Sequence, residues 1–341
     1  MKKNNFKIKS FVFVQTLLLC FCVQASSLRK VAQSGMQYLK IGVDAQMVGR
    51  GEAGISLSEG IQAVFWNPAG LSEIQGQGVF ISHNSWIADI SFDAFAYGYN
   101  LGNLGSIAVS AMWVDYGELK ATSVAHSLDE SNESGYIDEG IFQPVDLAFG
   151  LAYARKISSQ FSMGGQVRYL YESYGSNVIV LTNGEEKKID NTISAYSFDL
   201  GTRYLTGFKS LVFSMAIQNF SPDMKYHYES FSPPLTFKMG LAMDLLDFFN
   251  NKSRSQLLVA VDALHPRDYT ERLNLGLEYD YLGMFQLRSG YRMNYDEGEF
   301  AIGGGLRYPI NNMQLRCDIS YLVMSSKRFS SPMQITVGIN F

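Results

Sequence analysis

Ionisable residues of both signs recur along this chain at positions that alternate with apolar residues. Side chains of opposite charge on one face can pair into a network that holds a structure together, or they can line a polar path. The sequence leaves both uses open. The basic members are Arg168, Arg203, Arg288, Arg292, Arg307 and Arg316, and the acidic members are Asp199, Glu278, Asp280 and Asp318.

Residues suited to catalysis form no recognisable constellation. The histidines His83, His126, His227 and His265 are scattered without metal-ligand spacing. Ser82, His83 and Asn84 supply the residue types of a lipase without showing its geometry. Gly303, Gly304 and Gly305 do not lead from a strand into a helix, so they predict a tight spot within a strand and not a phosphate loop. We expect a non-enzymatic protein with no cofactor and no metal.

Strict period-two patterns indicate the elements that position the charges. The final stretch, MQITVGINF, alternates apolar residues from Met333 to Phe341 with polar ones. The stretch LNLGLEYDY places Leu273, Leu275 and Leu277 on one face and Glu278 on the other. Such patterns predict about fourteen strands between residues 76 and 341, an even number typical of outer-membrane barrels. The fold class is therefore all-β, a transmembrane antiparallel up-and-down barrel.

The direction of the two faces follows from the cost of burying charge. Uncompensated ions in a dry core cost several kcal/mol each, so the charged face belongs in a wet lumen and the apolar face against lipid. The connections agree with a barrel, because those at 118–143, 176–191 and 221–233 are long and polar while the intervening ones are tight. A soluble β-sandwich with its charged face outermost is the structural alternative.

The N-terminus carries the layout of a cleaved signal. Lys2, Lys3, Lys7 and Lys9 precede an apolar run that ends near residue 23. The alternative is a membrane anchor, but a run of about 13 residues is short of the ~20 that span a bilayer. Removing residues 1–25 moves the formal net charge from −4 to about −8, which argues against nucleic acid as a partner. The mature chain keeps only Cys317 and cannot form an internal disulfide.

Residues 26–75 precede the first strand and are too apolar for a loose tail. The pattern predicts a short helix over 58–65, capped by Ser58 and ended by Pro68. The most economical arrangement folds this segment into the barrel as a plug.

Several blocks of the chain resemble one family when taken in order. The blocks AVFWNPAGL, SHNSWIADISFDAFAYGY, MWVDYGEL, DLAFGLAYARKIS, FDLGTRYLTG and LGLEYDYLGMFQLRSGYR are similar to the PorV/PorQ family of FadL-like outer-membrane barrels. The resemblance implies fourteen strands with an N-terminal hatch. Its hatch motif corresponds here to Trp66, Asn67, Pro68, Ala69 and Gly70. The chain departs from the family at residues 48–51, VGRG, where Met-Gly-Gly is more usual.

The resemblance implies two functions in the outer membrane of a Gram-negative-type bacterium. The first is type IX protein secretion, with translocon or secreted cargo proteins bound by the three long connections. The alternative is passive uptake of hydrophobic small molecules, which requires an apolar cavity between hatch and wall. Outer-membrane lipid is the remaining partner. The terminal Phe341 resembles the assembly signal of outer-membrane proteins.

Overall fold

The computed structural model describes residues 34–124, 135–180, 186–225, 230–249 and 254–341. The predicted signal peptide, residues 1–25, lies outside these ranges, as do the first residues of the predicted plug.

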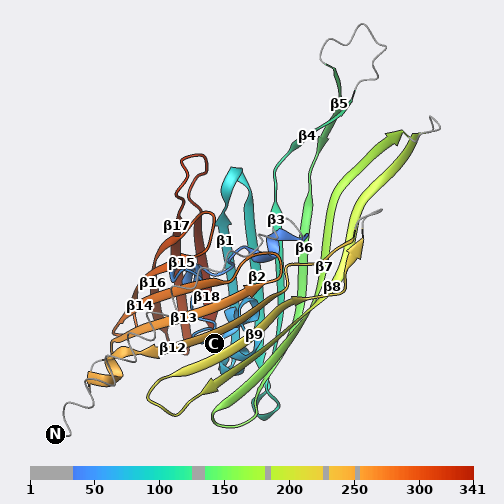
Figure 1. Ribbon diagram of the computed structural model, residues 1–341. Helices are drawn as coiled ribbons and strands as arrows, with labels where there is room; N and C mark the ends of the chain where they lie inside the picture. Colours follow the sequence, from blue (N-terminus) through green and yellow to red (C-terminus); the bar gives the residue numbers. More distant parts are fainter. Residues whose placement is uncertain (1–33, 125–134, 181–185, 226–229, 250–253) are drawn as a thin grey trace, which may run out of the picture.

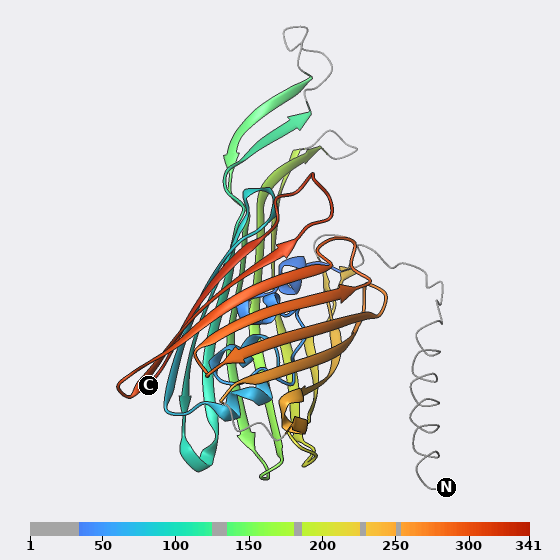
Figure 2. The ribbon, with the colours of Figure 1, turned by 90° about the vertical axis from the view of Figure 1, so that its left-hand side faces the viewer.

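Fourteen antiparallel strands close into one barrel (Figures 1 and 2). Each strand pairs with its neighbours in chain order, and β1 closes the ring against β18. The prediction of an up-and-down barrel with about fourteen strands is confirmed. The strands are β1 Gln77–Ser85, β2 Ser91–Asn100, β3 Ser106–Asp115, β6 Val145–Lys156, β7 Phe161–Val180, β8 Glu186–Leu205, β9 Val212–Phe220, β12 Thr236–Asp244, β13 Gln256–Pro266, β14 Arg272–Tyr281, β15 Phe285–Met293, β16 Phe300–Ile310, β17 Met313–Val323 and β18 Met333–Asn340.

The barrel exposes its apolar face and encloses its charged face. In β14, Leu275 and Leu277 point outward, 38% and 42% exposed, whereas Glu278 is 1% exposed. In neighbouring β15, Leu287 is exposed and Arg288 is buried. A soluble sandwich would show the reverse. The period-two pattern and the cost of buried charge together therefore predict correctly which face points outward.

The two rims of the barrel differ in the length of their connections. The short turns, which include η5 Gly102–Leu104, lie at one rim together with the longer η6 Leu245–Phe249 connection. At the opposite rim, which we call the outer rim, a hairpin of β4 Leu119–Val124 and β5 Tyr136–Phe142 projects far beyond the wall (Figures 1 and 2). The outer rim also carries η4 Ile87–Asp89 and the small pair β10 Met224–Lys225 and β11 Ser230–Phe231. In outer-membrane barrels the rim with the longer connections is the extracellular one, so the outer rim faces outward.

The prediction of a loop over 176–191 is wrong for most of its length. Strands β7 and β8 continue through it and pair with each other as far as Val180 and Glu186, after a register shift between Ser173 and Ser176. The polar residues of this stretch suggested a loop, but two strands above a rim need only their mutual backbone hydrogen bonds.

An N-terminal segment, residues 34–76, lies inside the ring of strands (Figure 2). Its helices are η1 Gln37–Lys40, α2 Ala45–Gly49, η2 Ile61–Phe65 and η3 Pro68–Glu73. The predicted helix over 58–65 is shorter than expected because Gly60, at φ 79°, precedes it. Pro68, which was expected only to end a helix, is the first residue of η3, since its fixed φ and missing N–H suit a first helical position. Among the described residues, no helix is long and apolar enough to cross a membrane.

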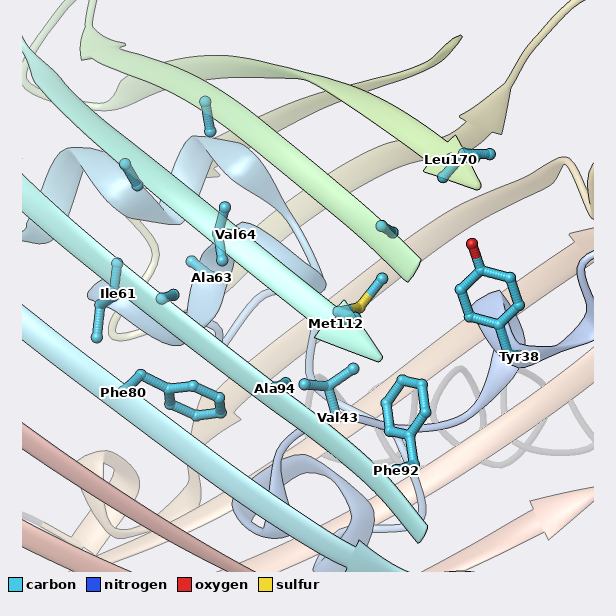
Figure 3. Packing of buried hydrophobic residues seen from close by; sticks show 14 of the residues in the cluster. Tyr38, Val43, Ile61, Ala63, Val64, Phe80, Phe92, Ala94, Met112 and Leu170 are labelled. Atoms are coloured by element: carbon cyan, nitrogen blue, oxygen red, sulfur yellow. The ribbon is translucent and has the colours of Figure 1, made fainter. Parts of the chain in front are cut away.

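The buried apolar core lies between this segment and one side of the barrel (Figure 3). Ile61, Ala63 and Val64 of the segment face small side chains of the wall such as Ala94. The ring of Phe65 packs against that of Phe80, with centroids 5.4 Å apart. Small inward residues on this side leave the volume that the segment fills.

Candidate functional site

The predicted hatch motif lies against the wall at β7 and β8. Asn67 caps η3, since its Oδ1 accepts a hydrogen bond from the amide of Ala69 at 3.2 Å. Its Nδ2 donates to the carbonyl of Thr202 in β8 at 3.1 Å. A Cβ atom at Gly201 would overlap the Asn67 side chain, so the close approach requires glycine there. Trp66 is buried, with the ammonium of Lys238 5.1 Å from its ring centroid.

A buried ion-pair cluster joins the N-terminal segment to β14–β17. Glu278 Oε2 contacts Arg50 Nη1 at 2.8 Å and Arg288 Nε at 2.7 Å. Arg288 Nη1 also contacts Asp318 at 2.7 Å, and Arg316 lies 2.9 Å from the same carboxylate. Arg50, Glu278, Arg288 and Asp318 are each 4% exposed or less, so their charges depend on one another.

Arg50 belongs to the network although it was not among the predicted charges. One sequence feature did point to Arg50, because the VGRG stretch departs from the family pattern at this arginine. Arg50 is 1% exposed and has its one described ion pair with Glu278, 228 residues away along the chain.

The remaining predicted charges are distributed around the wall. Arg168 pairs with Asp199 at 2.8 Å, and Arg307 lies 3.3 Å from Asp280. Two of the arginines contact acids of the N-terminal segment that were not predicted. Arg203 contacts Glu59 and Glu73, and Arg292 contacts Glu52 at 2.8 Å.

The N-terminal segment begins at the outer rim and ends at the inner one. Ser34 and Lys40 both contact the carboxylate of Asp268, in the connection between β13 and β14. Burial raises the pKa of Asp268, but hydrogen bonds from Lys40 and Ser34 outweigh it and hold the pKa below its usual value. Burial lowers the pKa of Lys40, and the pairing offsets this only in part. At the other end, Glu73 pairs with Lys156 at 2.7 Å.

A cavity of about 420 Å³ lies between the N-terminal segment and the outer half of the wall. Its apolar lining includes Leu39, Ile41 and Met112. The ammonium of Lys238 also lines it and has no ion pair among the residues that the structure describes. A second cavity, about 490 Å³, lies near the inner rim and is mostly polar, with Arg307, Arg316 and Phe341 among its lining residues.

Phe341 closes the barrel between its first and last strands. Its amide donates to the carbonyl of Gln77 at 2.9 Å, and its carbonyl accepts from the amide of Gln77 at 2.7 Å. Its role as an assembly signal stays a prediction.

The residue types considered for a lipase are separated by the pleat of β1. Ser82 is buried in the lumen, whereas His83 lies on the opposite face with Asp93 at 2.7 Å. In the described ranges no group of three or more His, Cys, Asp or Glu residues could hold a metal ion.

Comparison with known proteins identifies the family. The family model for the type IX secretion system protein PorV matches residues 24–264. The chain belongs to the PorV family. None of the curated proteins compared matches it.

Solved structures agree with the PorV-family fold. The toluene transporter TodX of Pseudomonas putida has a TM-score of 0.54 at 14% identity, over 87% of this chain and 97% of that one. A FadL homologue of Pseudomonas aeruginosa has a TM-score of 0.52 at 11% identity, over 88% and 98%. At such identities the likeness concerns the fold alone. This PorV-family chain is thus a FadL-like β-barrel of the outer membrane of a Gram-negative-type bacterium.

Proposed function

We propose that this barrel serves type IX protein secretion without catalysis, by binding translocon or cargo proteins at its outer rim. The membership in the PorV family supports a secretion role. The projecting β4–β5 hairpin is the observation that favours the outer rim as the binding surface (Figure 1).

The hairpin presents exposed apolar side chains on a ribbon that projects beyond the barrel wall. Tyr136, Ile137 and Ile141 are 52%, 47% and 64% exposed, and Leu119 on the facing strand is 42% exposed. A two-stranded ribbon has no interior in which to bury them. Apolar residues exposed to water in this way are typical of protein-binding sites.

We also propose that the N-terminal segment acts as a hatch that stays in place. Ion pairs hold it at three levels, through Lys40 at the outer rim, Arg50 in the middle and Glu73 near the inner rim. In this arrangement the buried charges serve as a structural network and do not form an open conduit.

The secretion role predicts that deleting the gene leaves type IX cargo inside the cell. Affinity purification of the wild-type barrel from native outer membrane should recover a large translocon subunit, identified by mass spectrometry. Replacing Ile137 and Ile141 together by Asn should reduce that recovery by about tenfold or more, because loss of interfacial apolar anchors costs ~1–2 kcal/mol or more.

Lys120→Gln on the same hairpin is the matched control, since Lys120 is exposed and polar. Its recovery should equal that of wild type. A normal secretome in the deletion strain would refute the secretion role, and unchanged recovery with the double variant would refute the hairpin as the binding surface.

Uptake of a hydrophobic small molecule is the second candidate, and the cavity beneath the outer rim favours it. Its apolar lining residues and the ammonium of Lys238, which has no described ion pair, suit a ligand with an apolar body and an anionic or polar end. Mass spectrometry of the purified barrel tests this function, because co-purified fatty acid or lipid that is lost in Lys238→Met would support uptake.

A further inference from the structure

Basic side chains outnumber their acidic partners around the cavity beneath the outer rim. The basic residues of the described chain that line it are Lys40, Arg168, Lys238, Arg272 and Arg292. Three of them are engaged by carboxylates, in the pairs Lys40–Asp268, Arg168–Asp199 and Arg292–Glu52. Lys238 and Arg272 form no ion pair with any residue in the described ranges. Two positive charges therefore remain uncompensated on the cavity wall.

These two cations lie in one row across the wall. Lys238 of β12 is the cross-strand partner of Leu264 in β13, and Leu264 is the partner of Arg272 in β14. Directly opposed side chains share one face of a sheet, and Leu264 is 7% exposed on the lumenal face. Neighbouring strands lie about 4.8 Å apart, so the backbones of the two basic residues are roughly 10 Å apart. Long basic side chains at this spacing can both reach one ligand group in front of Leu264.

Aromatic rings hold both cations without supplying a hydrogen-bond acceptor. The ammonium of Lys238 lies 5.1 Å from the ring centroid of Trp66. The guanidinium of Arg272 lies 4.2 Å from the ring centroid of Tyr269 and 4.1 Å from that of Tyr295. Contacts with ring faces stabilise a cation but leave its N–H groups to be filled by other partners. The Nε of Arg272 is buried and donates to no described residue, which points to an acceptor from outside the chain.

We propose that this cavity binds a single-chain amphiphile whose head is a phosphate monoester. The inference rests on the uptake candidate above and names the class of its ligand. A phosphate monoester carries a charge of about −1.5 to −2 at pH 7 and three acceptor oxygens, so it matches two cations where a carboxylate supplies only one charge. The volume of about 420 Å³ is in the lower part of the range of about 300–1,000 Å³ for small-molecule sites, which suits one chain. Leu39, Ile41 and Met112 offer the apolar surface for that chain.

Calorimetric titration of the purified full-length barrel in non-ionic detergent tests the site with octyl phosphate, octanoate and inorganic phosphate. We expect octyl phosphate to bind about tenfold or more tightly than octanoate, which offers one charge, and than inorganic phosphate, which has no chain. Lys238→Met and Arg272→Met should each weaken the binding of octyl phosphate by about tenfold or more, because each removes a charged donor.

The matched control is Arg328→Met, because Arg328 is an exposed arginine outside the cavity lining. It should bind octyl phosphate as wild type does. Heat-dependent migration on electrophoresis verifies that each variant is folded. Octanoate or inorganic phosphate that binds as tightly as octyl phosphate would overturn the proposal, and so would wild-type binding by either folded variant of the two cations.

Entry of octyl phosphate into lipid vesicles that contain the barrel separates the site from the uptake function. Binding that depends on both cations, without entry into the vesicles, would refute uptake and support the site. Entry at the same rate through wild type, Lys238→Met and Arg272→Met would support a passive path and overturn the two cations as its ligand site.

Discussion

Replacing Glu278 by Gln is expected to lower the free energy of unfolding by about 3–5 kcal/mol, the cost of removing one partner from a buried ion pair. Glu278 contacts Arg50 and Arg288 through the same oxygen, Oε2. Arg288 keeps Asp318 in the variant, but Arg50 loses its one described ion pair. The uncompensated guanidinium of Arg50 would weaken the hold of the wall on the N-terminal segment.

Urea unfolding of the barrel in lipid vesicles, followed by electrophoretic mobility, measures this loss. Glu271→Gln is the control, because it makes the same chemical change at an exposed position whose one described ion pair is with His265, at 3.3 Å. Surface pairs of this kind contribute about 0–1 kcal/mol. Equal midpoints for the two variants would mean that the buried cluster does not stabilise the barrel.

Replacing Gly290 by Ala is expected to displace the N-terminal segment from β15. A Cβ atom at Gly290 would overlap the backbone of Arg50 and Gly51, which cannot move aside as a flexible side chain can. Overpacking of this kind costs about 1–3 kcal/mol. Trypsin should then cleave at Arg50 in the folded variant, whereas in wild type this residue is buried.

Gly304→Ala in the adjacent strand β16 is the matched control. A Cβ atom there would meet its nearest neighbour, the carbonyl of Gln286, at 3.8 Å, which is an ordinary contact. This variant should resist trypsin as wild type does. Cleavage in both variants, or in neither, would show that the close approach at Gly290 does not hold the segment.

The wall of the barrel was predictable because the alternation of residues along each strand distinguishes its two faces. Leu275 and Glu278 reveal lipid and lumen through their alternation alone, without knowledge of any partner. The ribbon formed by the outer parts of β7 and β8 was not predictable, since its residues carry no regular apolar period.

The contacts within the lumen were predictable only in part. The arginines of the wall could be predicted to face the lumen because each lies on the polar face of its strand. Their partners Glu52 and Glu59 lie in a segment with no regular period, and Arg292 and Glu52 are 240 residues apart. Such pairing depends on how the segment is threaded through the barrel, which short-range patterns do not encode.

A disulfide that locks the N-terminal segment to the wall tests most directly whether the barrel works from its outer rim. In a Cys317→Ser background, Ile61→Cys and Gly78→Cys place two thiols where a Cβ at residue 78 lies 3.2 Å from that of residue 61, close to the ~3.8 Å of natural disulfides. We predict that cells with the oxidised lock secrete type IX cargo at the wild-type level. Loss of secretion that a reducing agent restores would contradict a fixed segment and show that the hatch must move.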